Sequence, residues 1–404
     1  MTRAALLVTL LLTPFLAVGA AWAADQPGQR FQILPADLPK PGATPAVSNN
    51  PVKTPRAGQV PAAPPGFKVT PFAEGLTSAR FLAVAPNGDV LLTERLGNKV
   101  TLLRDGNGDG KADQRFTFAE GLHNPSGIAV HDGYVYISDQ NAIWRTPYVA
   151  GANQAGKLER VTTAPDLRLT GMHGTRNFAF NADGALFVEM GSRDNVSEFQ
   201  PGAKIFQVQG GALTEYAGGL RNAVGIAFNP GTNDLFAAVN ERDGLGDNLP
   251  SDYFTFVKPG GFYGYPWAYN GKNPDPELGS KRPDMVEKSI TPDVLFPAHS
   301  APTGVAFYTG SMFPAQYKGD AFVSLHGSWN TSEPHGYKVV RIHMKNGRVD
   351  GHGFENFLTG FWDGLSKAPP QVWGRPVGLA VARDGALLVA DDMGNVIWRV
   401  SYGK

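Results

Sequence analysis

The feature that most constrains the fold of this chain is a four-residue phrase that recurs six times along it. Each copy reads a small or apolar residue, an apolar residue, Ala, and then Val or Phe. A phrase that recurs at roughly 45 to 80 residues indicates a repeat architecture, in which each repeat is one structural unit. The six copies are Phe81-Leu82-Ala83-Val84, Gly127-Ile128-Ala129-Val130, Asn177-Phe178-Ala179-Phe180, Gly225-Ile226-Ala227-Phe228, Gly304-Val305-Ala306-Phe307 and Gly378-Leu379-Ala380-Val381.

The last copy shows the repeated unit most clearly. We expect strands over 378–381, 386–390 and 396–400, because turn residues such as Asp384-Gly385 separate these apolar runs. Several short strands with Gly, Asp and Asn between them are typical of a propeller blade. The six copies therefore predict an all-β fold, a six-bladed β-propeller. The alternative, an ordinary β-sandwich, would leave the spacing of the copies to accident.

The two ends of the chain can close this ring. The last blade shows three strands, and the strand-like segment 67–72 lies before the first copy. This segment could supply the missing strand of the last blade, which would leave only short, protected strand edges.

The N-terminus has the features of a secretory signal peptide over residues 1–23. Arg3 precedes an apolar run that is too short to span a bilayer, and Ala21-Trp22-Ala23 is an A-x-A cleavage site. An uncleaved anchor is the alternative. No other stretch approaches the ~20 apolar residues of a spanning helix, so we expect no membrane span in the mature chain. With Cys 0, the chain has no disulfide framework, and we expect a periplasmic or secreted protein.

Residues 24–65 form a leader rich in Pro, Ala and Asn, before a propeller domain over 66–404. This composition favours either extended wrapping around the domain or a flexible linker. Because the leader holds no copy of the phrase and no candidate site residue, we expect it to be dispensable for catalysis.

Charge and loop length narrow the function. The chain has 36 basic and 36 acidic residues, whereas a nucleic-acid surface usually shows a basic excess, so we expect no nucleic-acid partner. The longest interruption of the repeat, 244–300, is rich in Tyr, Phe and Trp. Long connections in compact domains are often functional. These aromatic side chains either roof a ligand pocket or form a small core beneath the loop.

Polar residues gather beside the third and fourth copies, and propellers build their sites from such loops around the channel. His173 lies just before the third copy. It could take a proton at neutral pH, or it could be a structural hydrogen bonder. Arg221 and Asn222 precede the fourth copy, and the acidic stretch 240–248 follows the next strand. Carboxylates and turn carbonyls at this density suit a hard cation such as Ca²⁺, with a solvated turn as the alternative. The run 105–113 has the start of a calcium-loop spacing, and a tight polar turn is equally consistent with it.

Taken together, these motifs resemble the soluble PQQ-dependent sugar dehydrogenases, nearest the branch of L-sorbosone dehydrogenase-like and aldose sugar dehydrogenases. The resemblance covers roughly residues 65–402. The motifs that carry it are Leu92-Thr93-Glu94-Arg95, His173 before Phe178-Ala179-Phe180, Gly191-Ser192 with Asn195 and Glu198, Gly219-Leu220-Arg221-Asn222, Asn240-Glu241-Arg242-Asp243, Tyr263-Gly264-Tyr265-Pro266, His326-Gly327-Ser328-Trp329-Asn330 and Gly374-Arg375-Pro376.

The resemblance implies PQQ over the central channel, with one Ca²⁺ that joins it to the protein. It makes His173 the general base that takes the hydroxyl proton of a sugar or sugar aldehyde. It implies that Arg221 and Asn222 hold the quinone oxygens. The remaining roles that it implies are calcium ligands within Arg242–Asp247, with Arg242, Asp243 and Asp247 as candidates, cations for the cofactor carboxylates at Arg375 and Arg193, and a pocket wall at Trp329.

The chain also departs from the glucose-oxidising branch of that family. An Asp paired with the catalytic His is replaced here by Ser192, and the nearest acids are Asp194 and Glu198. These differences argue against glucose as the preferred substrate. We expect a quinone or a cytochrome as electron acceptor. The alternatives to a dehydrogenase are a binding propeller without chemistry and a calcium-dependent hydrolase of the lactonase type.

Overall fold

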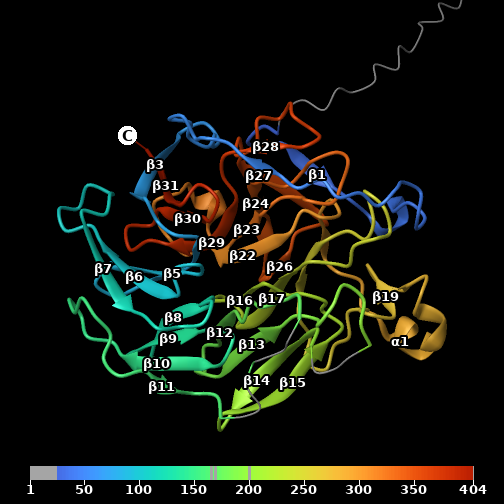
Figure 1. The fold of residues 1–404 in the computed structure, drawn as a ribbon, viewed down its shortest axis with the longest axis horizontal. Helices are drawn as coiled ribbons and strands as arrows, with labels where there is room; N and C mark the ends of the chain where they lie inside the picture. Colours follow the sequence, from blue (N-terminus) through green and yellow to red (C-terminus); the bar gives the residue numbers. More distant parts are fainter. Residues whose placement is uncertain (1–24, 164–166, 168–170, 199–201, 404) are drawn as a thin grey trace, which may run out of the picture.

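The computed structural model describes residues 25–163, 167, 171–198 and 202–403 of the chain. The signal peptide expected over residues 1–23 lies outside the described residues. Within them the chain forms six antiparallel sheets that surround a common centre, so the all-β, six-bladed propeller is confirmed (Figure 1).

Each blade has four strands that follow one another outward from the centre, and the fifth blade has one more. From the innermost strand outward, the blades are β4 (Ala79–Val84), β5 (Val90–Glu94), β6 (Lys99–Arg104) and β7 (Gln114–Ala119); β8 (Ile128–His131), β9 (Tyr134–Ser138), β10 (Ile143–Pro147) and β11 (Glu159–Arg160); β12 (Phe178–Phe180), β13 (Leu186–Met190), β14 (Lys204–Gln209) and β15 (Ala212–Gly218); β16 (Gly225–Asn229), β17 (Asp234–Val239), β18 (Tyr253–Phe256) and β21 (Val294–Leu295); β22 (Pro302–Phe307), β23 (Ala321–Leu325), β24 (Lys338–Ile342), β27 (Gly353–Leu358) and β1 (Arg30–Gln32); and β29 (Pro376–Val381), β30 (Leu387–Asp391), β31 (Val396–Tyr402) and β3 (Phe67–Glu74).

Short elements decorate this ring. Helix α1 and the hairpin that contains β19 lie at its outer edge (Figure 1). The short elements are β2 (Val52–Lys53), β28 (Gln371–Val372), β19 (Ala268–Tyr269), β20 (Asn273–Pro274), β25 (Met344–Lys345), β26 (Arg348–Val349), α1 (Pro283–Lys288), and the 3-10 turns Pro35–Asp37, Gly279–Lys281 and Ala315–Tyr317. No helix in the described part of the chain is long and apolar enough to cross a bilayer.

The recurring phrase marks the innermost strand of every blade, where neighbouring blades approach each other most closely. A Cβ atom on Gly378 would lie 2.3 Å from the carbonyl oxygen of Arg80, and one on Gly304 would lie 2.0 Å from that of Val377. Real Cβ atoms do not come this close to backbone. The phrase therefore begins with glycine at these positions because the inner strands of adjacent blades leave no room for a side chain.

Hydroxyl groups on the second strands tie each blade to the next. Thr93 Oγ1 donates to the carbonyl of Ser126 at 2.8 Å, and the Ser138 and Ser324 hydroxyls donate to the carbonyls of Arg176 and Val377. All these groups are buried, so the bonds satisfy main-chain acceptors that water does not reach.

The ring closes as the sequence predicts. Strand β3 pairs antiparallel with β31 from Phe67 opposite Tyr402 to Glu74 opposite Val396. The last blade thus combines both ends of the domain, and Phe67 packs edge-on against Phe313 and Phe357 of the fifth blade.

The leader wraps around the domain. Its strand β1 extends the fifth blade by pairing with β27, and β2 pairs in parallel with β28. Lys338, which is buried, donates to the carboxylate of Asp25 at 2.9 and 3.0 Å. In Figure 1 this blue segment follows the edge of the ring beside β27. Of the two interpretations of the leader, the structure describes the extended wrap.

Two other open alternatives are also resolved. Most aromatic rings of 244–300 are buried, and Tyr253 and Tyr263 join the core of the fourth blade, so they form a core and do not roof a pocket. In the run 105–113, the carboxylate of Asp105 accepts the main-chain amides of Gly108, Asp109 and Gly110. Since these amides already occupy the carboxylate, the run is a tight polar turn.

Candidate active site

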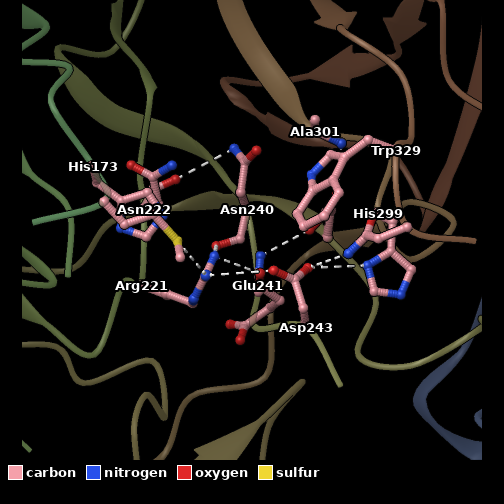
Figure 2. A pocket seen from close by; sticks show the side chains of 12 residues that line it. His173, Arg221, Asn222, Asn240, Glu241, Asp243, His299, Ala301 and Trp329 are labelled. Atoms are coloured by element: carbon pink, nitrogen blue, oxygen red, sulfur yellow. Dashed lines mark hydrogen bonds and ion pairs between the residues drawn. The ribbon is translucent and has the colours of Figure 1, made fainter. Parts of the chain in front are cut away.

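A cavity of about 250 Å³ opens beside the inner strands of the third, fourth and fifth blades. It is built where an inner strand begins or a second strand ends. Figure 2 shows His173 and Asn222 on one side, and Trp329 and His299 on the other. The lining residues are Met172, His173, Arg221, Asn222, Asn240, Glu241, Asp243, Asp252, His299, Ala301, Trp329 and Asn330.

His173 is held in one tautomer by the main chain. Its Nδ1 lies 2.7 Å from the carbonyl oxygen of Ser192, which can only accept a hydrogen bond. Nδ1 of the neutral ring therefore carries the hydrogen, and Nε2 keeps a free lone pair. Ser192 thus orients the ring through its carbonyl, where the resemblance implies a carboxylate. Asp194 turns only its carbonyl to Ser192, whose hydroxyl donates to it at 2.8 Å, and Glu198 pairs with Lys281 at 2.5 Å.

The ring of His173 stays neutral across the physiological range. Burial of the ring and the positive charge of Arg221 lower the pKa of His173 to about 3. At neutral pH the side chain is therefore an unprotonated base.

Arg221 is the centre of a buried hydrogen-bond network. Its Nε donates to the carbonyl of Asn195 at 3.0 Å, and its terminal nitrogens donate to the side-chain oxygen of Asn195 at 3.0 Å and to the carbonyl of Glu241 at 2.6 Å. One guanidinium nitrogen lies 3.9 Å from the carboxylate of Asp243. This side chain therefore fixes the floor of the cavity and gives it a positive charge.

Two buried acids stand beside this cation. Burial raises the pKa of Glu241 to about 8, and burial raises the pKa of Asp252 to about 6. The carboxylate of Asp252 accepts the amides of Glu241 and Ala301, both at 2.8 Å. Glu241 Oε1 and the nearby side-chain oxygen of Asn222 are buried without a hydrogen-bond partner. Unpaired buried acceptors in a cavity wall suit a ligand that offers positive charge or donors.

Asp243 and His299 form an ion pair on the opposite wall. Burial alone would raise the pKa of Asp243, but the hydrogen bond from His299 and the charge of Arg221 hold it below its usual range. Burial alone would lower the pKa of His299, but its contacts with Asp243 and with the carbonyl of Gly246 raise it. The Asn330 side chain also donates to Asp243, so the charge of this carboxylate is already largely balanced.

Four residues predicted for the site lie outside the cavity lining. Arg242 forms salt bridges of 2.6 Å with Asp275 and with Glu277. The carboxylate of Asp247 accepts the amide of Ser332 at 3.0 Å. Arg193, which is half exposed, accepts the amide of Met172 on its carbonyl at 2.7 Å. Of the three calcium-ligand candidates, only Asp243 therefore faces the cavity.

Arg375, the fourth, supports the loop that carries Trp329. It donates to the carbonyls of His326 at 2.9 Å and Gly327 at 2.6 Å. It belongs to a cationic group with Arg80, which pairs with Asp392 at 2.9 Å, and with Arg95, whose guanidinium makes no hydrogen bond or salt bridge to the described residues. Like Arg221, these residues lie at the start of an inner strand or the end of a second strand, so the group faces the same end of the channel.

The structure adds site residues that sequence reasoning did not single out. Asp252 and His299 line the cavity, but they come from a loop without the repeated phrase. Among the residues described here, no group of three or more His, Cys, Asp or Glu side chains is arranged to hold a metal. A cation here would therefore also need amide, carbonyl or ligand oxygens.

The fold and the cavity together define a six-bladed propeller whose polar site lies at one end of its channel. The family model that matches the chain is described as TrAA12-like and covers residues 61–267 and 279–403. This chain belongs to the TrAA12-like family.

Known relatives agree with this assignment. An uncharacterized protein of Borreliella burgdorferi is 31% identical over 303 residues, which are 72% of this chain and 78% of that protein. A pyrroloquinoline quinone-dependent pyranose dehydrogenase of Coprinopsis cinerea is 26% identical over 332 residues, which are 69% of this chain but only 44% of that enzyme. This chain therefore spans less than half of the dehydrogenase that it matches.

Solved structures show the same fold. A Trichoderma reesei protein of carbohydrate-active enzyme family AA12 has a TM-score of 0.72 and 21% identity, with 88% of this chain and 100% of that chain covered. The holo PQQ domain of pyranose dehydrogenase from Coprinopsis cinerea has a TM-score of 0.72 and 20% identity, over 87% and 99% of the chains. The PQQ-bound aldose sugar dehydrogenase of Streptomyces coelicolor has a TM-score of 0.61 and 22% identity, over 84% and 99%. The resemblance to PQQ-dependent sugar dehydrogenases is thus confirmed at the level of the family.

Proposed function

We propose that this protein is an oxidoreductase that acts on sugars, a PQQ-dependent dehydrogenase of pyranoses or related aldoses. The family assignment and the Coprinopsis cinerea relative support this class of reaction. One observation of the site carries it: a buried, neutral His173 has a free Nε2 in the same cavity as Arg221 and unpaired oxygen acceptors. Calcium dependence, an exported location and a substrate such as a sorbosone belong to the same proposal.

The cavity residues fit both implied cofactors. Asn222 Oδ1 and Glu241 Oε1 are buried oxygen acceptors without partners, and hard cations such as Ca²⁺ take oxygen ligands. Glu241 and Asn222 would hold the metal, since Asp247 and the side chain of Arg242 are engaged elsewhere. Arg95 and Arg375 would meet the cofactor carboxylates, because cations recognise carboxylates through charge-assisted hydrogen bonds.

Oxidation of a sugar hydroxyl to a carbonyl removes a hydride from carbon and a proton from oxygen. His173 Nε2 accepts this proton, since Nδ1 is fixed by Ser192. PQQ, when bound, supplies the two-electron acceptor, and Ca²⁺ polarises its carbonyl oxygen as a Lewis acid. Arg221 stabilises negative charge near His173 and keeps that ring neutral before the reaction. Trp329, which is 41% exposed at the mouth, offers an apolar face to the sugar ring.

The hydrolase alternative is less well supported. A calcium-dependent lactonase site needs carboxylate and Asn ligands from several blades. The acids that line this cavity, Glu241, Asp243 and Asp252, all come from the single connection between β17 and β18. For the physiological electron acceptor we keep the proposal of a quinone or a cytochrome.

Calorimetry of PQQ binding tests the proposal directly. We expect Ca²⁺ and PQQ to bind in a linked way, because the metal neutralises cofactor carboxylate charge, so a chelator should weaken PQQ binding. A panel of pyranoses and aldoses with an artificial dye acceptor then identifies the substrate. Equal PQQ affinity with and without chelator would remove the calcium role, and absence of PQQ binding would reject the cofactor assignment.

A further inference from the structure

Residues 25–65, which we call the strap, contact the loops that carry the cavity wall. The contacts are specific hydrogen bonds and involve two loops: 326–337, which follows β23 and contains Trp329, and 240–252, which connects β17 to β18. Since neither loop contains a regular strand, side-chain and loop contacts fix their positions.

Asn49 of the strap bonds directly to the loop of Trp329. Its amide donates to the carbonyl of Trp329 at 2.6 Å. Its side-chain nitrogen donates to the carbonyl of Thr331 at 2.9 Å and to that of Lys367 at 2.6 Å. One half-buried residue thus satisfies three main-chain acceptors and joins two separate loops on either side of Trp329.

A second set of contacts fixes the opposite loop. Thr44 Oγ1 accepts the amide of Asp247 at 2.8 Å, and Gly42 donates to the carbonyl of Leu245 at 2.9 Å. Asp247 in turn accepts the amide of Ser332, two residues beyond the Asn330 that donates to Asp243. The strap, the two loops and the cavity carboxylate therefore form one connected hydrogen-bond network.

We propose that the strap is the outer support of the active-site wall and that Asn49 is a positioning residue, which sets the place of the Trp329 ring at the cavity mouth and thereby the affinity for the sugar. The leader was expected to be dispensable because it holds no site residue, but these contacts connect it to the site. The part that concerns sugar affinity depends on the proposed dehydrogenase function. The part that concerns the loop does not.

Three single variants separate this role from general stability. Asn49→Ala removes two side-chain hydrogen bonds and keeps the main-chain bond. Asn49→Asp keeps the size but places a carboxylate against two carbonyl oxygens, so it should perturb the loop more. Asn50→Asp is the matched control, because the exposed Asn50 contacts only the hydroxyl of Ser48, at 3.3 Å. Circular dichroism checks that each variant is folded.

Hydrogen exchange gives a readout that needs no substrate. We expect amides of the 326–337 loop to exchange fastest in Asn49→Asp, more slowly in Asn49→Ala, and as in the wild type in Asn50→Asp. In the reconstituted enzyme, Asn49→Ala should raise KM for the sugar roughly 3- to 10-fold, the size of one or two lost hydrogen bonds, with kcat within about 2-fold. Should Asn49→Asp not fold, Thr44→Val, which removes only the acceptor for Asp247, should speed exchange in 244–249.

Unchanged exchange in 326–337 for both Asn49 variants would overturn the proposal, and so would a fall in kcat at constant KM. If the wild type oxidises no sugar, the dehydrogenase function fails, while the exchange data still decide whether the strap positions the wall.

Discussion

At the scale of single residues, the site depends on how the chain fixes protons. The carbonyl of Ser192 sets the tautomer of His173, and Arg221 and burial keep that ring neutral. The sequence could predict His173, Arg221 and Asn222, because each flanks a copy of the repeated phrase. It could not predict Asp252 or His299, because long-range folding of the 244–300 loop brings them into the cavity.

Replacement of His173 by Ala should abolish turnover without loss of the cofactor. The base accepts the hydroxyl proton, and removal of a general base typically lowers the rate by roughly 10²- to 10⁴-fold. We expect kcat to fall by this factor while calorimetry shows PQQ bound as in the wild type. His352→Ala, at an exposed position bonded to the carbonyl of Asp293, should have no effect. Wild-type turnover in His173→Ala would remove this residue from the mechanism.

Glu189 should make the fold less stable as the pH rises. It is fully buried in β13, and burial raises its pKa to about 8 from a model value of 4.5. The folded state therefore holds a proton that the unfolded state loses above 4.5, so this contribution to stability is complete below pH 4.5 and disappears as the pH rises through 8.

Glu189→Gln mimics the protonated acid and keeps an acceptor for the amide of Asn177. In urea titrations we expect this variant to be more stable than the wild type at pH 9 by on the order of 3 to 5 kcal/mol, and nearly equal to it at pH 5. An equal difference at both pH values would show that Glu189 is ionised in the fold.

At the scale of elements, the repeated phrase predicted the inner strands because its period and its glycines have one physical cause. Adjacent inner strands pack backbone to backbone, which excludes a Cβ at Gly304 and Gly378. The role of the strap could not be predicted in this way. Its hydrogen bonds to the Trp329 and Asp247 loops come from an extended chain without periodicity, so composition alone left a wrap and a linker as equal alternatives.

Gly378→Ala should destabilise the ring at the junction of the first and last blades. Its Cβ would lie 2.3 Å from the Arg80 carbonyl and 2.8 Å from the Phe81 Cα, so backbone must shift. Overpacking of this kind costs roughly 1–3 kcal/mol, which chemical denaturation measures. Gly231→Ala is the control, because its nearest neighbour is a side-chain oxygen at 3.3 Å. Equal unfolding midpoints for both variants would contradict the close packing of the inner strands.

At the scale of the whole molecule, ring closure by β3 and β31 joins both ends of the domain and leaves one end of the channel to carry the chemistry. The base lies before the third blade, the buried acids follow the second strand of the fourth, and the cationic group of Arg80, Arg95 and Arg375 spans the last and first blades. Because the site is shared by blades far apart in sequence, its assembly depends on the closed ring.

The most direct test of the central claim is anaerobic reduction of the bound quinone. The protein is loaded with PQQ and Ca²⁺, and its absorption spectrum is followed while single pyranoses and aldoses are added without any other electron acceptor. We predict rapid reduction by at least one sugar in the wild type, and reduction slowed by the same factor as turnover in His173→Ala. A fully loaded wild-type protein whose quinone stays oxidised with every sugar would contradict the assignment as a sugar dehydrogenase.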